Sequence, residues 1–142
     1  QPHELLLRGA RLPRYPGLQF GLPATTRLVR HWHRQRPDAV YVATEGPLGW
    51  SALRAARRLA IPVATGFHTR FDAYMADYGL PWLRPLALAW MRRVHNHADA
   101  TLVPTAQLQA ELAGLGFKRV QRLRRAVDTD LFTPERRDPA LR

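Results

Sequence analysis

The sequence predicts an α/β fold built on a doubly wound, mostly parallel β-sheet. Short unbroken apolar runs at residues 39–43, 61–67 and 98–103 are typical of strands that are buried on both faces. Segments with helical periodicity lie between these runs, which is the order of elements in βαβ units. Hydrophobic residues make up 46% of the 142 residues and charged residues 23%, so the composition is that of a folded domain and not of a disordered chain.

The first 22 residues show little regular pattern. Leu5–Leu7 is a candidate short strand, and the prolines and glycines that follow it predict a long loop or crossover. Residues 24–35 are expected to form a helix, because Pro23 precedes them and proline is favoured in the first turn. The strand at 39–43 comes next along the chain.

Two longer helices are expected to cover the sheet through apolar stripes. The first spans 48–59; its inward residues are Leu48, Ala52, Ala55, Ala56 and Leu59, and its opposite side carries Arg54, Arg57 and Arg58. A short helical piece is expected at 71–78, and the second long helix spans 81–97. Its apolar stripe is Trp82, Leu83, Leu86, Trp90 and Val94, and its opposite face carries Arg84, Arg92 and His95.

The C-terminal third predicts one more helix and one more strand. Thr105 is expected to cap a helix that ends at Leu115, because threonine is favoured at that position and Gly116 follows the end. Residues 120–123 are expected to form the fourth strand. After Asp128 the chain is polar and broken by proline, so residues 1–127 are interpreted as one domain and residues 128–142 as the start of a linker.

The composition limits the classes of function. There are 22 Lys+Arg against 11 Asp+Glu, a net charge of +11, which leaves nucleic-acid binding open as an alternative. The arginines are spread along the whole sequence rather than clustered, so a surface that favours phosphates on a nucleotide or on lipid headgroups is preferred. The absence of cysteine excludes disulfides, thiol nucleophiles and cysteine-based zinc sites, and no apolar run approaches the roughly 20 residues of a membrane span.

Common catalytic motifs are also missing from the sequence. It contains no Walker loop, no G-x-G-x-x-G and no G-x-S-x-G, which argues against a P-loop enzyme and a simple hydrolase. The pairs His31/His33 and His95/His97 are two residues apart, and on a helix such pairs cannot share a metal. No metal site is therefore predicted.

The candidate site lies in three turns that follow strands, because ligands of such sheets bind beyond the carboxyl ends of the strands. His68 directly follows the second strand and is expected to project into the cleft, where it could contact a phosphate or a sugar hydroxyl, or transfer a proton. Glu45 could accept hydrogen bonds from sugar hydroxyls, and Gly46 would let a ligand approach the backbone. The alternatives are a structural histidine and a glutamate favoured by a helix N-terminus. Further candidates after His68 are Arg70, Asp72, Tyr74 and Tyr78, which could equally cap a helix or pack.

Four blocks of the sequence, spread over about residues 4–137, resemble the N-terminal domain of family 4 glycosyltransferases. They are T-E-G-P-L-G-W within 36–53, G-F-H-T-R-F-D-A-Y at 66–74, H-N-H-A-D with L-V-P-T within 95–105, and V-D-T-D-L-F-T-P at 127–134. They look most like the bacterial GDP-mannose-dependent α-mannosyltransferase branch, which is related to the sulfoquinovosyltransferases. Where the family has glycine before V-D, this sequence has Ala126.

The resemblance implies a GT-B enzyme with two Rossmann-like domains, of which this chain is the N-terminal, acceptor-binding one without its first strand. The donor domain would follow the linker at 128–142. The family's F-H-T histidine corresponds to His68, with a catalytic role. Substrate-binding roles are expected for Glu45, Gly46, Thr69, Arg70, Tyr74 and Asp128.

The function implied is transfer of a hexosyl group, with mannosyl expected, from a nucleotide-diphosphate sugar such as GDP-mannose to a lipid or glycan acceptor. Anomeric configuration would be retained and no metal or other cofactor is expected. Such an enzyme would be cytoplasmic, with peripheral binding to an anionic inner membrane face, and the 142 residues alone would be inactive. The alternatives are a non-catalytic Rossmann-like module that binds a phosphorylated ligand, and a basic nucleic-acid-binding protein.

Overall fold

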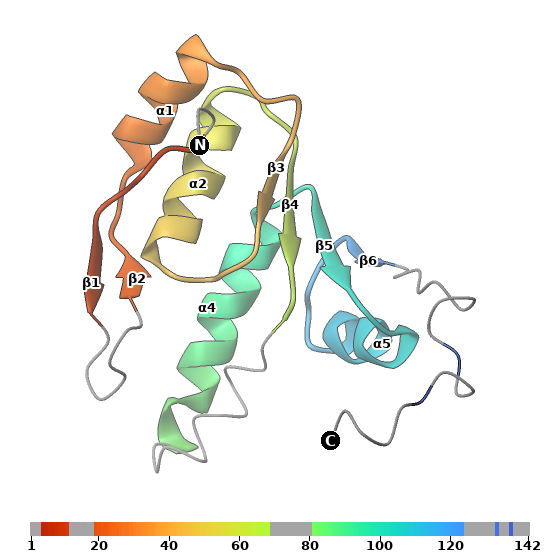
Figure 1. Ribbon diagram of the computed structural model, residues 1–142. Coiled ribbons are helices and arrows are strands. Elements are labelled where there is room, and N and C mark those ends of the chain that lie inside the picture. The colour runs from red at the N-terminus through yellow and green to blue at the C-terminus, as the bar shows by residue number, and fades with distance from the viewer. Residues whose placement is uncertain (1–3, 12–18, 69–80, 124–132, 134–136, 138–142) are drawn as a thin grey trace.

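The computed structural model describes residues 4–11, 19–68, 81–123, 133 and 137. Its centre is a parallel sheet of four strands in the order β3-β4-β5-β6 (Figure 1). The strands are β3 (Val40–Val42), β4 (Val63–Gly66), β5 (Ala100–Val103) and β6 (Val120–Arg122). Each strand pairs in parallel with the next strand along the chain, so the predicted parallel α/β sheet is confirmed.

Helices alternate with these strands, as the sequence predicts. They are α1 (Thr25–Arg34), α2 (Pro47–Arg58), α4 (Arg84–Asn96, after a 3-10 turn at Pro81–Leu83) and α5 (Ala106–Gly114). The Thr105 hydroxyl accepts a hydrogen bond from the Leu108 amide at 3.2 Å, and Gly116 has a positive φ of 83° just past the helix end. Both predicted ends of α5 are therefore confirmed, whereas the helical piece expected at 71–78 lies outside the described residues.

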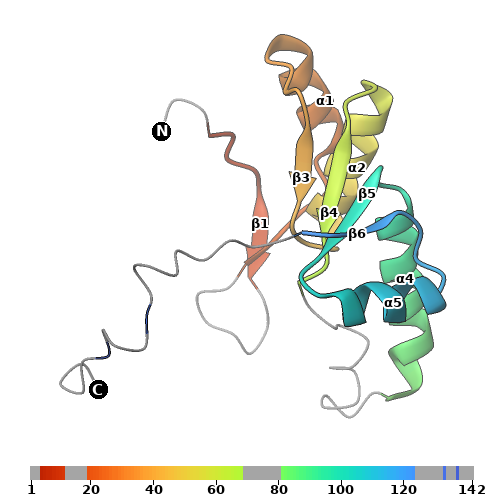
Figure 2. The same ribbon diagram turned by 90° about the vertical axis from the view of Figure 1, so that its right-hand side faces the viewer.

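The described helices that contact the sheet cover one of its two faces. Val42 of β3 and Val63 of β4 point into a core with Leu53 of α2 and Val94 of α4. Because side chains alternate along a strand, the residues next to Val42 and Val63 in their strands point to the opposite face. A crossover that always steps to the next strand in the same direction keeps its helices on one side, and Figure 2 shows α2, α4 and α5 there. Tyr41 lies on the opposite face and is 50% exposed, so the prediction that this strand is buried on both faces is wrong within the described residues.

Two clusters of buried side chains hold the helices to the sheet. The first cluster lies between α2, β3, β4 and the end of α4, and contains Val42, Leu53, Ala56, Ile61, Val63, Val94 and Ala98. The second lies between α4, α5 and β5, and contains Phe67, Met91, Val103, Leu112 and Phe117. Helix α4 contributes to both clusters, so it joins the two halves of the layer.

The N-terminal residues differ from the prediction. A two-stranded antiparallel hairpin is formed by β1 (Gly9–Arg11) and β2 (Gln19–Gly21), whereas Leu5–Leu7 is not a strand. The Leu22 amide donates to the Arg8 carbonyl at 2.9 Å and extends the pairing of β1 with β2. Among the described residues, β1 therefore has a partner strand, whereas Leu5–Leu7 has none. A Cβ on Gly21 would overlap the side chain of Leu48, so the hairpin lies against the start of α2.

The buried face of α4 matches the predicted stripe only at Val94. Trp82 and Leu86 are 72% and 68% exposed, whereas Met91, Val94 and His95 are buried. The spacing of these three residues defines a stripe rotated away from the tryptophans. The prediction that His95 lies on the solvent face with Arg84 and Arg92 is therefore wrong, because the imidazole finds hydrogen-bond partners inside the protein.

Candidate functional site

The turn between β3 and α2 presents Glu45 and Gly46 at the carboxyl edge of the sheet. Gly46 is the N-cap of α2, and Pro47 occupies the first turn, where a missing amide hydrogen costs no helical bond. A Cβ on Gly49 would overlap the Thr44 carbonyl oxygen, so the first turn of α2 lies directly against the backbone that leaves β3. The sequence therefore brings Glu45 to this edge through the close packing of a strand end on a helix start.

Two side chains of α4 hold Glu45 in place. The Trp90 indole Nε1 donates to the Glu45 carbonyl oxygen at 3.0 Å. The Glu45 carboxylate oxygen Oε1 lies 3.2 Å from Nε2 of His95, and the Glu45 side chain is 12% exposed. Both backbone and side chain of this residue are thus fixed by a helix that lies far away in the sequence.

The hydrogen bonds continue from His95 into the core. Its Nδ1 lies 2.8 Å from the hydroxyl of Thr65 in β4, and that hydroxyl lies 3.3 Å from the hydroxyl of Thr101 in β5. His95 is 1% exposed, and the ring of Phe67 lies against it with centroids 5.2 Å apart. A polar chain therefore runs from the edge of the sheet through a buried imidazole to two adjacent strands.

A cavity of about 560 Å³ opens beside Glu45 at this edge. Its walls come from strand β2, the β3–α2 turn and helix α4; the lining residues are Gln19, Phe20, Gly21, Ala43, Thr44, Glu45, Gly46, Pro47, Leu48, Ala87, Trp90 and Met91. Most of these side chains are apolar, with Thr44 and Glu45 as polar groups beside the N-terminus of α2. The size and the few convergent polar groups are typical of a small-ligand site.

His68 is the second residue after β4, and it lies on the other face of the sheet from this cavity. Its Nε2 lies 2.7 Å from the hydroxyl of Tyr41, and both side chains are exposed. A Cβ on Gly66 would overlap the Tyr41 hydroxyl and the His68 ring, so this pair lies across a position that only glycine leaves open. The structure brings Glu45 and Gly46 together at the cavity, and it places His68 with Tyr41 instead.

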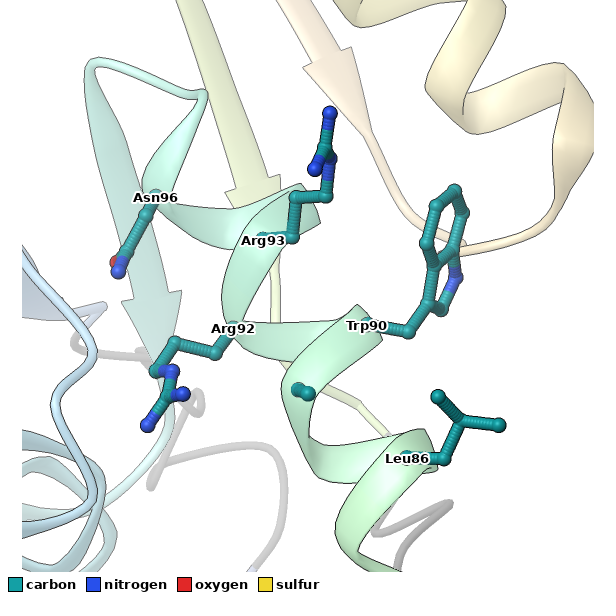
Figure 3. A pocket seen from close by; sticks show the side chains of 6 residues that line it. Leu86, Trp90, Arg92, Arg93 and Asn96 are labelled. Carbon is teal, nitrogen blue, oxygen red and sulfur yellow. The ribbon is translucent and has the colours of Figure 1, made fainter. Parts of the chain in front are cut away.

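The outer face of α4 carries a shallow groove of about 410 Å³ (Figure 3). Leu86 and Trp90 lie on one side of this groove and Arg92 and Asn96 on the other, with Arg93 between them. Arg92 donates to the Leu115 carbonyl at 3.3 Å, and the Arg93 guanidinium lies 5.6 Å from the centre of the Trp50 ring. The groove therefore combines exposed apolar and cationic groups.

Six candidate site residues lie outside the described residues: Thr69, Arg70, Asp72, Tyr74, Tyr78 and Asp128. Sequence reasoning missed Tyr41, Thr65, Trp90 and His95. Tyr41 and Thr65 could have been assigned to opposite faces of the sheet, because side chains alternate along a strand. Nothing in the sequence pairs Trp90 or His95 with Glu45.

Over residues 4–11, 19–68 and 81–123, no helix is long and apolar enough to cross a bilayer, and no three His, Asp or Glu side chains are grouped to hold a metal ion.

The sequence is similar to those of known proteins. The chain is 35% identical to the GDP-mannose-dependent alpha-mannosyltransferase of Mycobacterium tuberculosis over 98% of its own length, and 35% identical to that of Mycolicibacterium smegmatis over 99%. It is 29% identical to the sulfoquinovosyl transferase SQD2 of Arabidopsis thaliana over 92% of its length. The chain covers 39%, 40% and 26% of these relatives, respectively.

No solved structure matches the chain significantly. The family model described as Glycosyltransferase Family 4 matches residues 2–131, which is nearly the whole sequence. This chain therefore belongs to Glycosyltransferase Family 4.

Proposed function

We propose that this chain is the acceptor-side half of a retaining glycosyltransferase that moves a mannosyl group from GDP-mannose to a lipid or glycan acceptor. Three relatives named GDP-mannose-dependent alpha-mannosyltransferase support the donor, at 32% to 35% identity. In this proposal residues 1–127 form the acceptor-binding domain and residues 128–142 begin the linker to a donor-binding domain. Because transfer needs both substrates in one closed cleft, the 142 residues alone would not transfer sugar.

The cavity beside Glu45 is the observation that carries the proposal. A carboxylate accepts hydrogen bonds from sugar hydroxyls, and an exposed indole such as Trp90 offers an apolar face to the C–H groups of a sugar ring. The amide groups at the start of α2 favour negative charge or electron-rich oxygen. The apolar lining residues Phe20, Leu48 and Met91 would pack against part of a lipid acceptor.

The donor side of the proposed reaction uses the residues after β4. His68 would contact the mannosyl group and support the charge that develops during transfer. Thr69, Arg70 and Tyr74 would bind substrate in the same segment, and Asp128 would do so at the start of the linker. For His68 to reach the cleft, its ring has to turn away from the Tyr41 hydroxyl, which is 2.7 Å away. The proposed enzyme uses no metal and no cofactor besides its nucleotide-sugar donor.

A membrane surface is proposed as the place where a lipid acceptor is reached. Exposed Leu86 and Trp90 line the groove on α4 together with Arg92 and Arg93, and this combination suits an anionic interface. The proposed location is the cytoplasm, with reversible binding at the inner face of the membrane.

The test uses the full-length protein with GDP-mannose that is radiolabelled in the sugar. We expect label to appear in a lipid or glycan product, with the α configuration of the donor retained when the product is examined by NMR. Transfer from another nucleotide sugar alone would replace the mannosyl assignment. Tight binding of a phosphorylated ligand without any transfer would favour a binding module, and strongly salt-dependent binding of DNA or RNA would favour a nucleic-acid-binding protein.

A further inference from the structure

We propose that His95 is a positioning residue, which orients the Glu45 carboxylate toward the cavity so that its second oxygen, Oε2, receives a hydroxyl of the acceptor. The proposal adds that the Thr65 hydroxyl selects the ring tautomer of His95. This inference rests on the proposed function, since it assigns the cavity to the acceptor. Nothing in the sequence pattern indicates it, because His95 was expected on the solvent face.

The position of the imidazole is fixed by its surroundings. His95 is 1% exposed and packs against the rings of Phe67 and Phe117, with centroid distances of 5.2 and 5.7 Å, and those two rings also contact each other at 5.7 Å. Both ring nitrogens have a partner, Thr65 at 2.8 Å and Glu45 at 3.2 Å. A buried ring that is enclosed in this way cannot rotate without losing both hydrogen bonds.

The partners also determine which nitrogen carries the proton. An ionised Glu45 carboxylate only accepts hydrogen bonds, so Nε2 of His95 must donate to Oε1. In a neutral imidazole Nδ1 is then an acceptor, and the Thr65 hydroxyl can donate to it. When the single Thr65 proton is directed at Nδ1, it is not donated to the Ala100 carbonyl at 3.4 Å or the Thr101 hydroxyl at 3.3 Å, which are the longer contacts. Removal of the Thr65 hydroxyl therefore removes the group that favours this tautomer.

The side chain and the backbone carbonyl of Glu45 are each held by a separate hydrogen bond. Oε1 is bonded to His95, and the backbone carbonyl is bonded to Trp90 at 3.0 Å. Both supports come from α4, so the carboxylate keeps one orientation relative to the cavity wall that Trp90 and Met91 form. A carboxylate that is already ordered loses less conformational freedom when a hydroxyl binds, which raises affinity for the acceptor and leaves donor affinity unchanged.

The experiment measures kinetics of the full-length protein with two matched pairs of variants. His95→Leu and Thr65→Val should raise the acceptor KM about tenfold or more, because a hydrogen bond to a charged group is lost or misdirected. His95→Gln keeps an N–H donor and Thr65→Ser keeps the hydroxyl, so both should retain an acceptor KM within about threefold of wild type. The KM for GDP-mannose should stay unchanged in all four variants. In a Glu45→Gln background, His95→Leu should have little further effect.

A second measurement does not depend on transfer. The ¹⁵N NMR shifts of the His95 ring should show a protonated Nε2 and an unprotonated Nδ1, and Thr65→Val should change this pattern whereas Thr65→Ser should not. If His95→Leu does not fold, the Thr65 pair still tests the proposal by both readouts.

The outcomes separate this inference from the proposed function. An active wild-type protein whose acceptor KM is unchanged by His95→Leu and Thr65→Val would overturn the positioning role and leave the function standing. A protonated Nδ1 in wild type would overturn the tautomer assignment. If the wild-type protein transfers no sugar to any acceptor, the proposed function fails, and the acceptor role of Glu45 fails with it, even where the NMR pattern is as expected.

Discussion

The hydroxyl of Tyr41 and Nε2 of His68 lie 2.7 Å apart, and this contact joins the middle of β3 to the second residue after β4. The two rings meet edge to face at 71°. The pair lies on the face of the sheet that the described helices leave uncovered. His68, which is proposed to act in transfer, is therefore held by the hydroxyl of Tyr41. Because that hydroxyl is the only polar group of the Tyr41 side chain, it can be removed without changing His68.

Replacing His68 by alanine should lower turnover of the full-length protein by more than about tenfold, which corresponds to roughly 1.4 kcal/mol of transition-state stabilisation. The side chain is exposed, so the free energy of unfolding should change little. Turnover and a denaturant unfolding curve check the two parts. Wild-type turnover in this variant would remove His68 from the mechanism.

The variant Tyr41→Phe removes the hydroxyl that holds His68 and keeps the aromatic ring. We expect a change in unfolding free energy within about 1 kcal/mol, because an exposed hydrogen bond contributes little. The ¹⁵N NMR shifts of the His68 ring should change because Nε2 loses its partner, and turnover should change. The control is the same substitution in a His68→Ala background, where a further change in turnover would show that Tyr41 acts independently of His68.

Gly66→Ala should destabilise the protein by about 1–3 kcal/mol, because the new methyl group would overlap the Tyr41 hydroxyl and the His68 ring. Gly114→Ala is the matched control. A Cβ at Gly114 meets no atom within 4 Å, and its place in helix α5 predicts a gain of about 0.5–1 kcal/mol. Unfolding in urea measures both, and equal effects of the two substitutions would contradict the close approach at Gly66.

Removing the N-cap of α5 by Thr105→Ala should cost about 0.5–2 kcal/mol of unfolding free energy, since the Leu108 amide loses its acceptor. Thr105→Ser keeps the oxygen and should recover most of the loss. Chemical denaturation compares the three proteins. A Thr105→Ala protein as stable as wild type would mean that the cap contributes nothing to α5.

Binding to anionic vesicles should weaken as salt is raised, because each Arg near an anionic bilayer contributes about 1 kcal/mol and salt screens it. Arg92 and Arg93 are exposed on α4 beside the groove, so the double change to glutamine should reduce co-sedimentation of the full-length protein with anionic lipid. Neutral vesicles are the control. Equal binding to both lipids, or no effect of salt, would show that these arginines are only a solvated surface.

Local patterns in the sequence predicted most of the described fold, because caps and apolar runs act over a few residues. Thr105 and Gly116 mark the two ends of α5 through their own backbone and side-chain chemistry. The apolar run at 39–43 correctly predicted a strand, but it did not predict that Tyr41 is exposed. Whether a second layer of structure covers Tyr41 depends on parts of the chain that are remote from it in sequence. The stripe of α4 was assigned to the large apolar residues, although the packing buries His95 and exposes Trp82.

The candidate site was predictable only in position. Topology brings Glu45, Gly46 and His68 to the carboxyl edge of the sheet, and a sequence pattern is enough to infer that. The partners of Glu45 and His68 come from other elements across the fold. Pairing of this kind depends on helix rotation and side-chain packing, which periodicity does not determine.

The order of strands in the sheet is also their order of synthesis on the ribosome. Among the described residues, β3, β4, β5 and β6 each pair with their neighbours along the chain, so each new strand can pair with the strand that was synthesised before it. Helix α2 can close over β3 and β4 before α5 has been translated. Glu45 gains its partners Trp90 and His95 only once α4 has emerged, so the carboxylate becomes ordered later than the strand that carries it.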